Sequence, residues 1–153
     1  KNRNSPKAVN KRVSVKQSYG YGALHLVSLS GGRFDFPVVG EFVLGHMIGS
    51  GYEMQVTARM QGISMDNGAN FTSITRVAIK MTQSQTSKAI EIFSNSQGEI
   101  QKQGDHYGFV QAHHNKSIVA GFGRFGVNVS VQINPILVVA IQMPDNAQIS
   151  GLL

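Results

Sequence analysis

The sequence lacks cysteine and tryptophan, and it has few charged residues and no long apolar run. Without cysteine, the chain can form no disulfide framework, no thiolate zinc site and no cysteine nucleophile. Only 14% of its residues are charged, well below the quarter usual in globular proteins, whereas a disordered chain is rich in charge and poor in apolar residues. No apolar run approaches the roughly 18 residues of a membrane-spanning helix. We therefore expect a folded chain in which no segment spans a membrane.

The formal net charge of +6 lies entirely in the first sixteen residues. That segment contains six cations and no acid: Lys1, Arg3, Lys7, Lys11, Arg12 and Lys16. The other eight of the fourteen Lys and Arg are balanced by all eight Asp and Glu, so residues 17–153 are formally neutral. The 153 residues fit one domain of ordinary size, and no shift in composition marks a second one. We therefore predict a flexible basic N-terminal arm over residues 1–16 and a single domain over residues 17–153.

A basic arm on a neutral body attracts polyanions, because each Lys or Arg that neutralises a phosphate releases a condensed counterion. The segment is polar and has no strong apolar period before Val13 and Val15. The six cations are therefore our candidate nucleic-acid-binding residues, with contacts that do not depend on sequence. A solubilising tail without a specific polyanion partner stays open as an alternative. Binding to a membrane surface would need an apolar face or a lipid anchor, and the sequence shows neither.

The body of the chain is typical of β-strands. From Tyr52 to Met60, apolar and polar residues alternate without a break, which is the period of a half-buried strand. The same alternation runs through Val77–Met81 and Val127–Ile133. Weaker candidates are the runs Leu24–Leu29, Lys88–Phe93 and Tyr107–Ala112. The run Ile136–Met143 is nearly all apolar, which predicts a strand covered on both faces or a contact between subunits.

Turn signals separate these runs, and long helices are not predicted. Seventeen glycines are spread along the chain, and Gly is a poor helix former. The polar stretch Thr82–Lys88 has room for one helical turn at most. Strands spaced roughly 8–15 residues apart suggest a sandwich, a jelly roll or a barrel. We predict an all-β fold, an antiparallel jelly-roll β-sandwich of about eight strands, with the methionines filling its core.

No constellation of residues supports catalysis or a cofactor. The acids are scattered, and no nucleophile motif is present. The stretch Gly121–Gly126 is glycine-rich but lacks the G-K-[ST] of a phosphate loop, so we interpret it as a bent or bulged strand in which glycine allows close backbone approach. Phe122, Arg124 and Phe125 in this stretch favour core or interface packing over stacking on bases.

Histidine and asparagine offer the remaining candidate sites. Asp105 and His106, followed by His113 and His114, have no standard metal-ligand spacing, and adjacent histidines on a strand point to opposite faces. We therefore predict no metal site. Three glycosylation sequons begin at Asn70, Asn115 and Asn128, and they matter only in a secreted chain.

Two passages resemble strands of the coat proteins of small icosahedral viruses of the satellite plant virus type. Ser28–Gly40 has paired glycines, alternating apolar residues and a Pro-Val-Val-Gly ending, and Phe71–Gln83 looks like a later strand of that fold. The resemblance implies a jelly-roll subunit, self-assembly into a closed shell, and contacts between the arm and packaged nucleic acid. RNA is the type of nucleic acid that we expect. It implies the virion as the location of the protein.

The combined prediction is a viral capsid protein that is not an enzyme, binds no cofactor and associates with many copies of itself. Two alternatives stay open. One is a structural subunit without nucleic acid, such as a phage decoration or spike protein or a filament subunit. The other is a secreted trimeric binding module of the jelly-roll type, which occupied sequons would favour.

Overall fold

A computed structural model describes residues 25–28, 31–64, 66–104, 110–114, 116–133, 136–144 and 147–153 of the chain. These residues form strands joined by turns, with a single 3-10 turn, η1 (Gly123–Phe125). The strands are β1 (His25–Val27), β2 (Arg33–Asp35), β3 (Gly40–Gly49), β4 (Tyr52–Ser64), β5 (Asn70–Gln83), β6 (Thr86–Ser94), β7 (Ile100–Gly104), β8 (Val110–His114), β9 (Ser117–Phe122), β10 (Val127–Ile133), β11 (Leu137–Gln142) and β12 (Gln148–Ser150). Within these ranges, no helix has the length and apolar character needed to cross a membrane.

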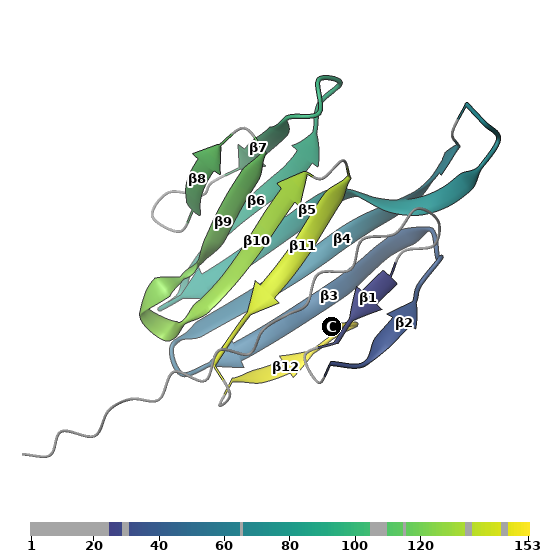
Figure 1. Cartoon of the computed structure of the whole chain (residues 1–153). Coiled ribbons are helices and arrows are strands. Elements are labelled where there is room, and N and C mark those ends of the chain that lie inside the picture. Colours follow the sequence, from purple (N-terminus) through teal and green to yellow (C-terminus); the bar gives the residue numbers. More distant parts are fainter. Residues whose placement is uncertain are drawn as a thin grey trace, which may run out of the picture.

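The strands form two antiparallel sheets that pack face to face, with a small ribbon of β1 and β2 beside them (Figure 1). One sheet has six strands in the order β12-β3-β4-β5-β6-β7, and the other has four in the order β11-β10-β9-β8. The four-stranded sheet lies in front of the six-stranded sheet in Figure 1. The predicted all-β class and the antiparallel sandwich are therefore confirmed.

The strand order differs from the jelly roll that we predicted, and the number of strands is twelve over the described ranges rather than about eight. A jelly roll is built from two Greek keys, in which long connections separate strands that follow each other in the sequence. Here consecutive strands are neighbours, as in two meanders, and β12 alone returns to pair with β3. The two-residue turns at Ser50-Gly51 and Ser84-Gln85 give the reason, because such short connections can join only adjacent antiparallel strands.

The predicted alternation is confirmed in the three clearest strands. In β4, Tyr52, Met54 and Val56 are buried, as are Ala58 and Met60 further along. In β5 the inward residues Val77, Ile79 and Met81 are fully buried. In β10 the inward valines are fully buried, and the residues between them are half-buried.

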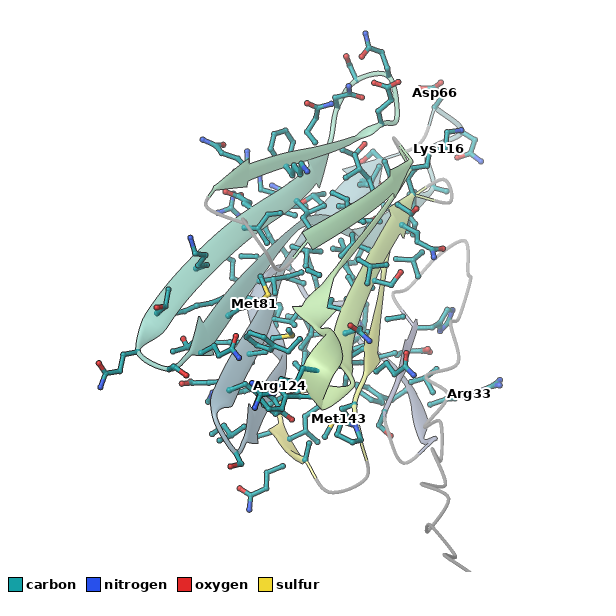
Figure 2. The ribbon with its side chains drawn as sticks, turned by 90° about the vertical axis from the view of Figure 1, so that its left-hand side faces the viewer. Arg33, Asp66, Met81, Lys116, Arg124 and Met143 are labelled. Atoms are coloured by element: carbon teal, nitrogen blue, oxygen red, sulfur yellow. The ribbon has the colours of Figure 1, made fainter. Side chains whose placement is uncertain are left out.

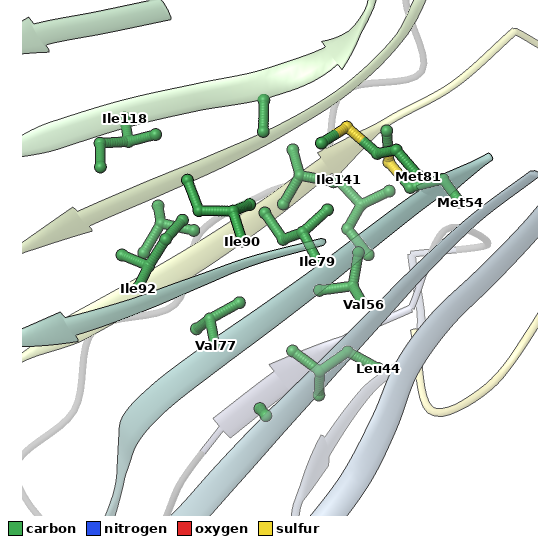
Figure 3. Packing of buried hydrophobic residues seen from close by; sticks show 14 of the residues in the cluster. Leu44, Met54, Val56, Val77, Ile79, Met81, Ile90, Ile92, Ile118 and Ile141 are labelled. Carbon is green, nitrogen blue, oxygen red and sulfur yellow. The ribbon is translucent and has the colours of Figure 1, made fainter. Parts of the chain in front are cut away.

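The core fills the space between the two sheets. Figure 3 shows Val56, Ile79 and Ile90 of the six-stranded sheet facing Ile118 and Ile141 of the four-stranded sheet. The methionines of the described ranges are also buried, which confirms their predicted place in the core: Met47, Met54, Met60, Met81 and Met143. In Figure 2, Met81 lies in the interior, whereas Asp66 and Lys116 lie near one end of the molecule and Arg124 lies toward the other.

The stretch Thr82–Lys88 forms no helical turn. It contains the end of β5, a two-residue turn and the start of β6. Both turn residues have positive φ, 48° at Ser84 and 73° at Gln85, which is the conformation that a tight hairpin turn requires. The polar sequence marked a surface turn, but it carried no glycine or asparagine to identify the hairpin.

Candidate self-association surface

The outer faces of the two sheets differ in charge. The outer face of the six-stranded sheet has charged side chains on β3, β4, β5 and β6: Glu41, Glu53, Arg59, Arg76, Lys80 and Glu91. Three cross-strand pairs connect most of them. His46 Nε2 lies 2.7 Å from Glu53 Oε1, Arg59 Nε donates to Glu41 Oε1 at 2.7 Å, and Arg76 donates to Glu91 Oε1 at 2.9 Å.

The register explains this pattern of pairs. Arg59 lies directly opposite Arg76, an arrangement in which like charges repel. Glu41 on one side and Glu91 on the other each bind one of the two arginines, and Arg76 also lies 5.5 Å from the centre of the Phe93 ring. The described acids and bases of this face offset each other, so the face is typical of a solvated surface and forms no basic patch.

The outer face of the four-stranded sheet has no charged side chain on β9, β10 or β11. The residues that alternate with the buried ones on these strands form this uncharged face: Ser117, Val119, Gly121, Asn128, Ser130, Gln132, Val138, Ala140 and Gln142. All of them are half-buried except Gln142, which is exposed. Depletion of charge is the compositional signal of the central part of a protein interface.

Glycine at position 121 lets two strands of the uncharged face approach each other closely. Gly121 lies opposite Asn128 in the register of β9 and β10. A Cβ at Gly121 would lie 2.3 Å from the backbone oxygen of Val127 and 2.6 Å from Asn128 Oδ1, so only glycine fits there. Gln132 Nε2 donates to Ser130 Oγ at 3.3 Å, which satisfies one polar group within the face.

The free edges of the two sheets differ in how they are protected from pairing with another strand. Natural proteins protect edges with short strands, charged side chains or bulges. The edge strand β12 has only three residues, β8 has a register shift between Ala112 and His114, and β7 carries Lys102 opposite the buried Ile92. The edge strand β11 has none of these features: it contains no charge and no proline, and its register with β10 is continuous over six pairs.

The apolar run Ile136–Met143 therefore contains β11, the edge strand of the four-stranded sheet that lacks these protections. Among the described residues, its outer face is only half-buried, so the prediction of a strand covered on both faces is not confirmed. Leu137 and Ile141 face the core and are buried, whereas Val138 and Ala140 lie on the uncharged face and are half-buried. The alternative prediction, a contact between subunits, stays a prediction.

Exposed apolar side chains also occur on β2, β3 and the segment between them. The exposed large hydrophobic residues of the described ranges all fall between residues 34 and 48: Phe34, Val38, Val39, Val43 and Ile48. Val39, at 63% relative exposure, has the largest exposed fraction of the five. Val43 and Ile48 lie on the outer face of β3 among the charged residues, with Ile48 opposite Glu53, and scattered exposed apolar residues of this kind are normal on a protein surface.

The glycine-rich stretch Gly121–Gly126 contains the last two residues of β9, the 3-10 turn η1 and Gly126, and it leads directly into β10. Phe122 is buried, and its ring centre lies 5.6 Å from that of Tyr52, while the Phe125 ring centre lies 4.7 Å from Tyr52. This confirms packing for both phenylalanines. The guanidinium of Arg124 lies 5.2 Å from the centre of the Phe125 ring. Burial in this aromatic cluster raises the pKa of Tyr52 above its ordinary value of 10.0.

The remaining candidate residues divide into those that the structure describes and those outside it. The arm residues Lys1, Arg3, Lys7, Lys11, Arg12 and Lys16 lie outside the described residues, as do Asp105, His106 and Asn115. His113 and His114 belong to β8. Over the ranges that the structure describes, no three His, Asp or Glu side chains gather as metal ligands do.

The two sequons within the described ranges have different surroundings. Asn70 is exposed at the start of β5, in the part of the β4–β5 hairpin that extends beyond the paired lengths of β3 and β6. Asn128 is half-buried on the uncharged face, where it covers Gly121. Asn70 is therefore the more accessible of the two to a modifying enzyme.

Of the two passages that we compared with viral coat proteins, Phe71–Gln83 lies within β5. Ser28–Gly40 contains β2 and the first residue of β3, and its other described residues lie outside strands. No protein-family model matches the chain, and no curated protein matches its sequence.

Proposed function

We propose that this chain is a viral coat subunit that associates with copies of itself into a closed shell and contacts packaged nucleic acid through residues 1–16. The observation that carries the proposal is the uncharged face, on a body whose other large sheet face is charged. A face without charge can be covered by another copy with no like-charge repulsion and no cost of burying an unpaired ion.

A shell needs more contacts than a simple dimer. A single two-fold interface uses the same surface on both subunits and closes after two copies. A larger closed assembly needs a second contact. We assign that contact to exposed apolar side chains between Phe34 and Ile48, of which Val39 has the largest exposed fraction.

The location of the net charge supports contact with nucleic acid. Residues 17–153 are formally neutral, so the +6 of the first sixteen residues is available to phosphates. Six charges per subunit neutralise only part of a genome, so other cations or partial packaging would complete the balance. No base-stacking array is proposed, because Phe122 and Phe125 pack in the aromatic cluster.

The proposal is tested by the mass and composition of the native material. Light scattering after size exclusion and nuclease treatment gives the mass, and the 260/280 nm absorbance ratio gives the nucleic-acid content. We expect a particle of many copies that protects nucleic acid. An assembly without nucleic acid would instead support a decoration, spike or filament subunit. A trimer with a glycan on Asn70 would support a secreted binding module, and a monomer at all concentrations would contradict self-assembly.

A further inference from the structure

The structure assigns β11 as the strand through which two copies of this chain pair edge to edge, so that their four-stranded sheets join into one continuous antiparallel sheet. This inference rests on the proposed self-association and specifies its geometry. The joined sheet would run β8-β9-β10-β11 in one copy and continue through β11-β10-β9-β8 of the second. The two copies would be related by a two-fold axis through the middle of the paired strands.

The edges of the sheets select β11. An edge strand presents a row of unpaired backbone N–H and C=O groups, which makes it a template for another strand. The edge strand β7 has a charged side chain, the edge strand β8 has a bulge, and the edge strand β12 is short. The edge at β11 is six residues long, regular and apolar. It is therefore the edge on which added pairing meets the fewest obstacles.

The surroundings of β11 favour a second copy as the occupant. The strand and the uncharged face next to it contain no charge, so a two-fold axis at this edge brings no like charges together. Because the partner strand is identical, its inward residues match those of β11: Leu137 and Ile141 are buried in the core, and Val139 packs against it. The two cores would thus meet along one apolar seam, and Val138 and Ala140 would extend the uncharged face across the join.

The geometry of strands restricts the register, and two of the allowed registers place the two-fold axis at the middle of β11. Residues directly opposite each other in an antiparallel pair have their side chains on the same face of the sheet. A two-fold axis therefore cannot place an inward residue such as Val139 opposite an outward one such as Ala140. The central registers that remain place either Val139 opposite Val139 or Ala140 opposite Ala140. In the first register Val138 faces Ala140, and in the second Val138 faces Gln142.

A charge on the strand tests the inference. The variant Ala140→Lys puts a cation at the join without entering the core, because Ala140 lies on the outer face. The matched control is Ala78→Lys, which puts the same side chain on the exposed outer face of β5, the fourth strand of the six-stranded sheet. Light scattering over a concentration series should show that Ala140→Lys raises the concentration for association at least about tenfold relative to Ala78→Lys, a loss of about 1.4 kcal/mol.

Cysteine crosslinking identifies the register and keeps the test valid if Ala140→Lys does not fold. The natural chain contains no cysteine, so each introduced thiol is unique. If Ala140 lies opposite Ala140, a short thiol crosslinker should join two copies of Ala140→Cys. If Val139 lies opposite Val139, the crosslinker should join Val138→Cys to Ala140→Cys in a mixture of the two variants. The control Ala78→Cys should not crosslink at the same protein concentration.

Each other outcome overturns a specific part of the argument. If the wild type associates, Ala140→Lys matches Ala78→Lys and neither cysteine experiment gives dimers, then self-association stands and edge pairing is wrong. If the wild type is a monomer at every concentration, both proposals fail. If the β11 amides that are not bonded to β10 are protected from hydrogen exchange equally at a concentration where light scattering shows monomer and at one where it shows association, a segment of the same chain covers the edge, and a second copy does not.

Discussion

At the scale of single residues, the close approach of β9 and β10 on the uncharged face depends on glycine at position 121. The backbone of β9 passes so close to β10 that a side chain at Gly121 would lie 2.3 Å from the Val127 oxygen and 2.8 Å from Asn128 Cα. Both contacts are with backbone, which moves less easily than the end of a side chain. Relief of the overlap would require β9 and β10 to separate locally, and that would disturb the face and the pairing together.

We therefore expect Gly121→Ala to lower the free energy of unfolding by about 1–3 kcal/mol, the usual cost of overpacking. Gly62→Ala in β4 is the control, since a Cβ there meets nothing within 4 Å. It should leave stability unchanged or raise it by up to about 1 kcal/mol, because alanine restricts the unfolded chain. Urea unfolding at one fixed protein concentration measures both variants. Equal loss of stability in the two would show that the close approach at Gly121 is not rigid.

At the scale of strands, sequence pattern identified the longest runs of strict alternation and missed others, among them the regular strand β9 and the irregular strand β3. The unbroken alternation of Tyr52–Met60 predicted β4, and the structure places its apolar residues in the core. The neighbouring strand β3 was not predicted, because a register shift between Val43 and Gly45 breaks its period of two. A bulge changes which face each later residue occupies, so a search for strict alternation fails there.

The turn between β5 and β6 gives a prediction at the same scale. Gln85 has a φ of 73°, and a residue with a Cβ in the left-handed region costs roughly 1–2 kcal/mol relative to the usual region. Glycine has no such cost, so Gln85→Gly should raise the free energy of unfolding by about 1 kcal/mol. The control Gln85→Ala removes the side chain beyond Cβ and keeps the Cβ that causes the strain. If Gln85→Ala stabilises the protein as much as Gln85→Gly, the gain comes from loss of the glutamine side chain and not from backbone strain.

At the scale of the whole molecule, the sequence predicted two properties of the fold correctly and the topology incorrectly. Alternating strands and low charge led to an antiparallel sandwich, which the structure shows. The jelly-roll order was wrong because local pattern says which residues form strands and does not say which strands pair. The uncharged face could not be recognised either, since its residues come from β9, β10 and β11 and become one surface only when register aligns them.

The separation of charge between residues 1–16 and the rest of the chain leads to a prediction that net charge alone does not make. Replacing the six cations of the arm by glutamine lowers the net charge from +6 to zero. A control lowers it by the same amount through six cations of the described body: Arg33, Lys80, Lys88, Lys102, Lys116 and Arg124. If nucleic acid responds to total charge, both variants should retain equally little of it.

We expect the two variants to differ, because counterion release depends on cations that lie against the phosphates. The arm variant should assemble and lose most of the nucleic acid protected from nuclease, whereas the body variant should retain it. The 260/280 nm absorbance ratio of the assembled fraction measures the difference, with light scattering to show that both assemble. Loss of nucleic acid from the body variant alone would locate the contact on the sheets instead of residues 1–16. That result would contradict the arm hypothesis and leave the uncharged face as the basis for self-association.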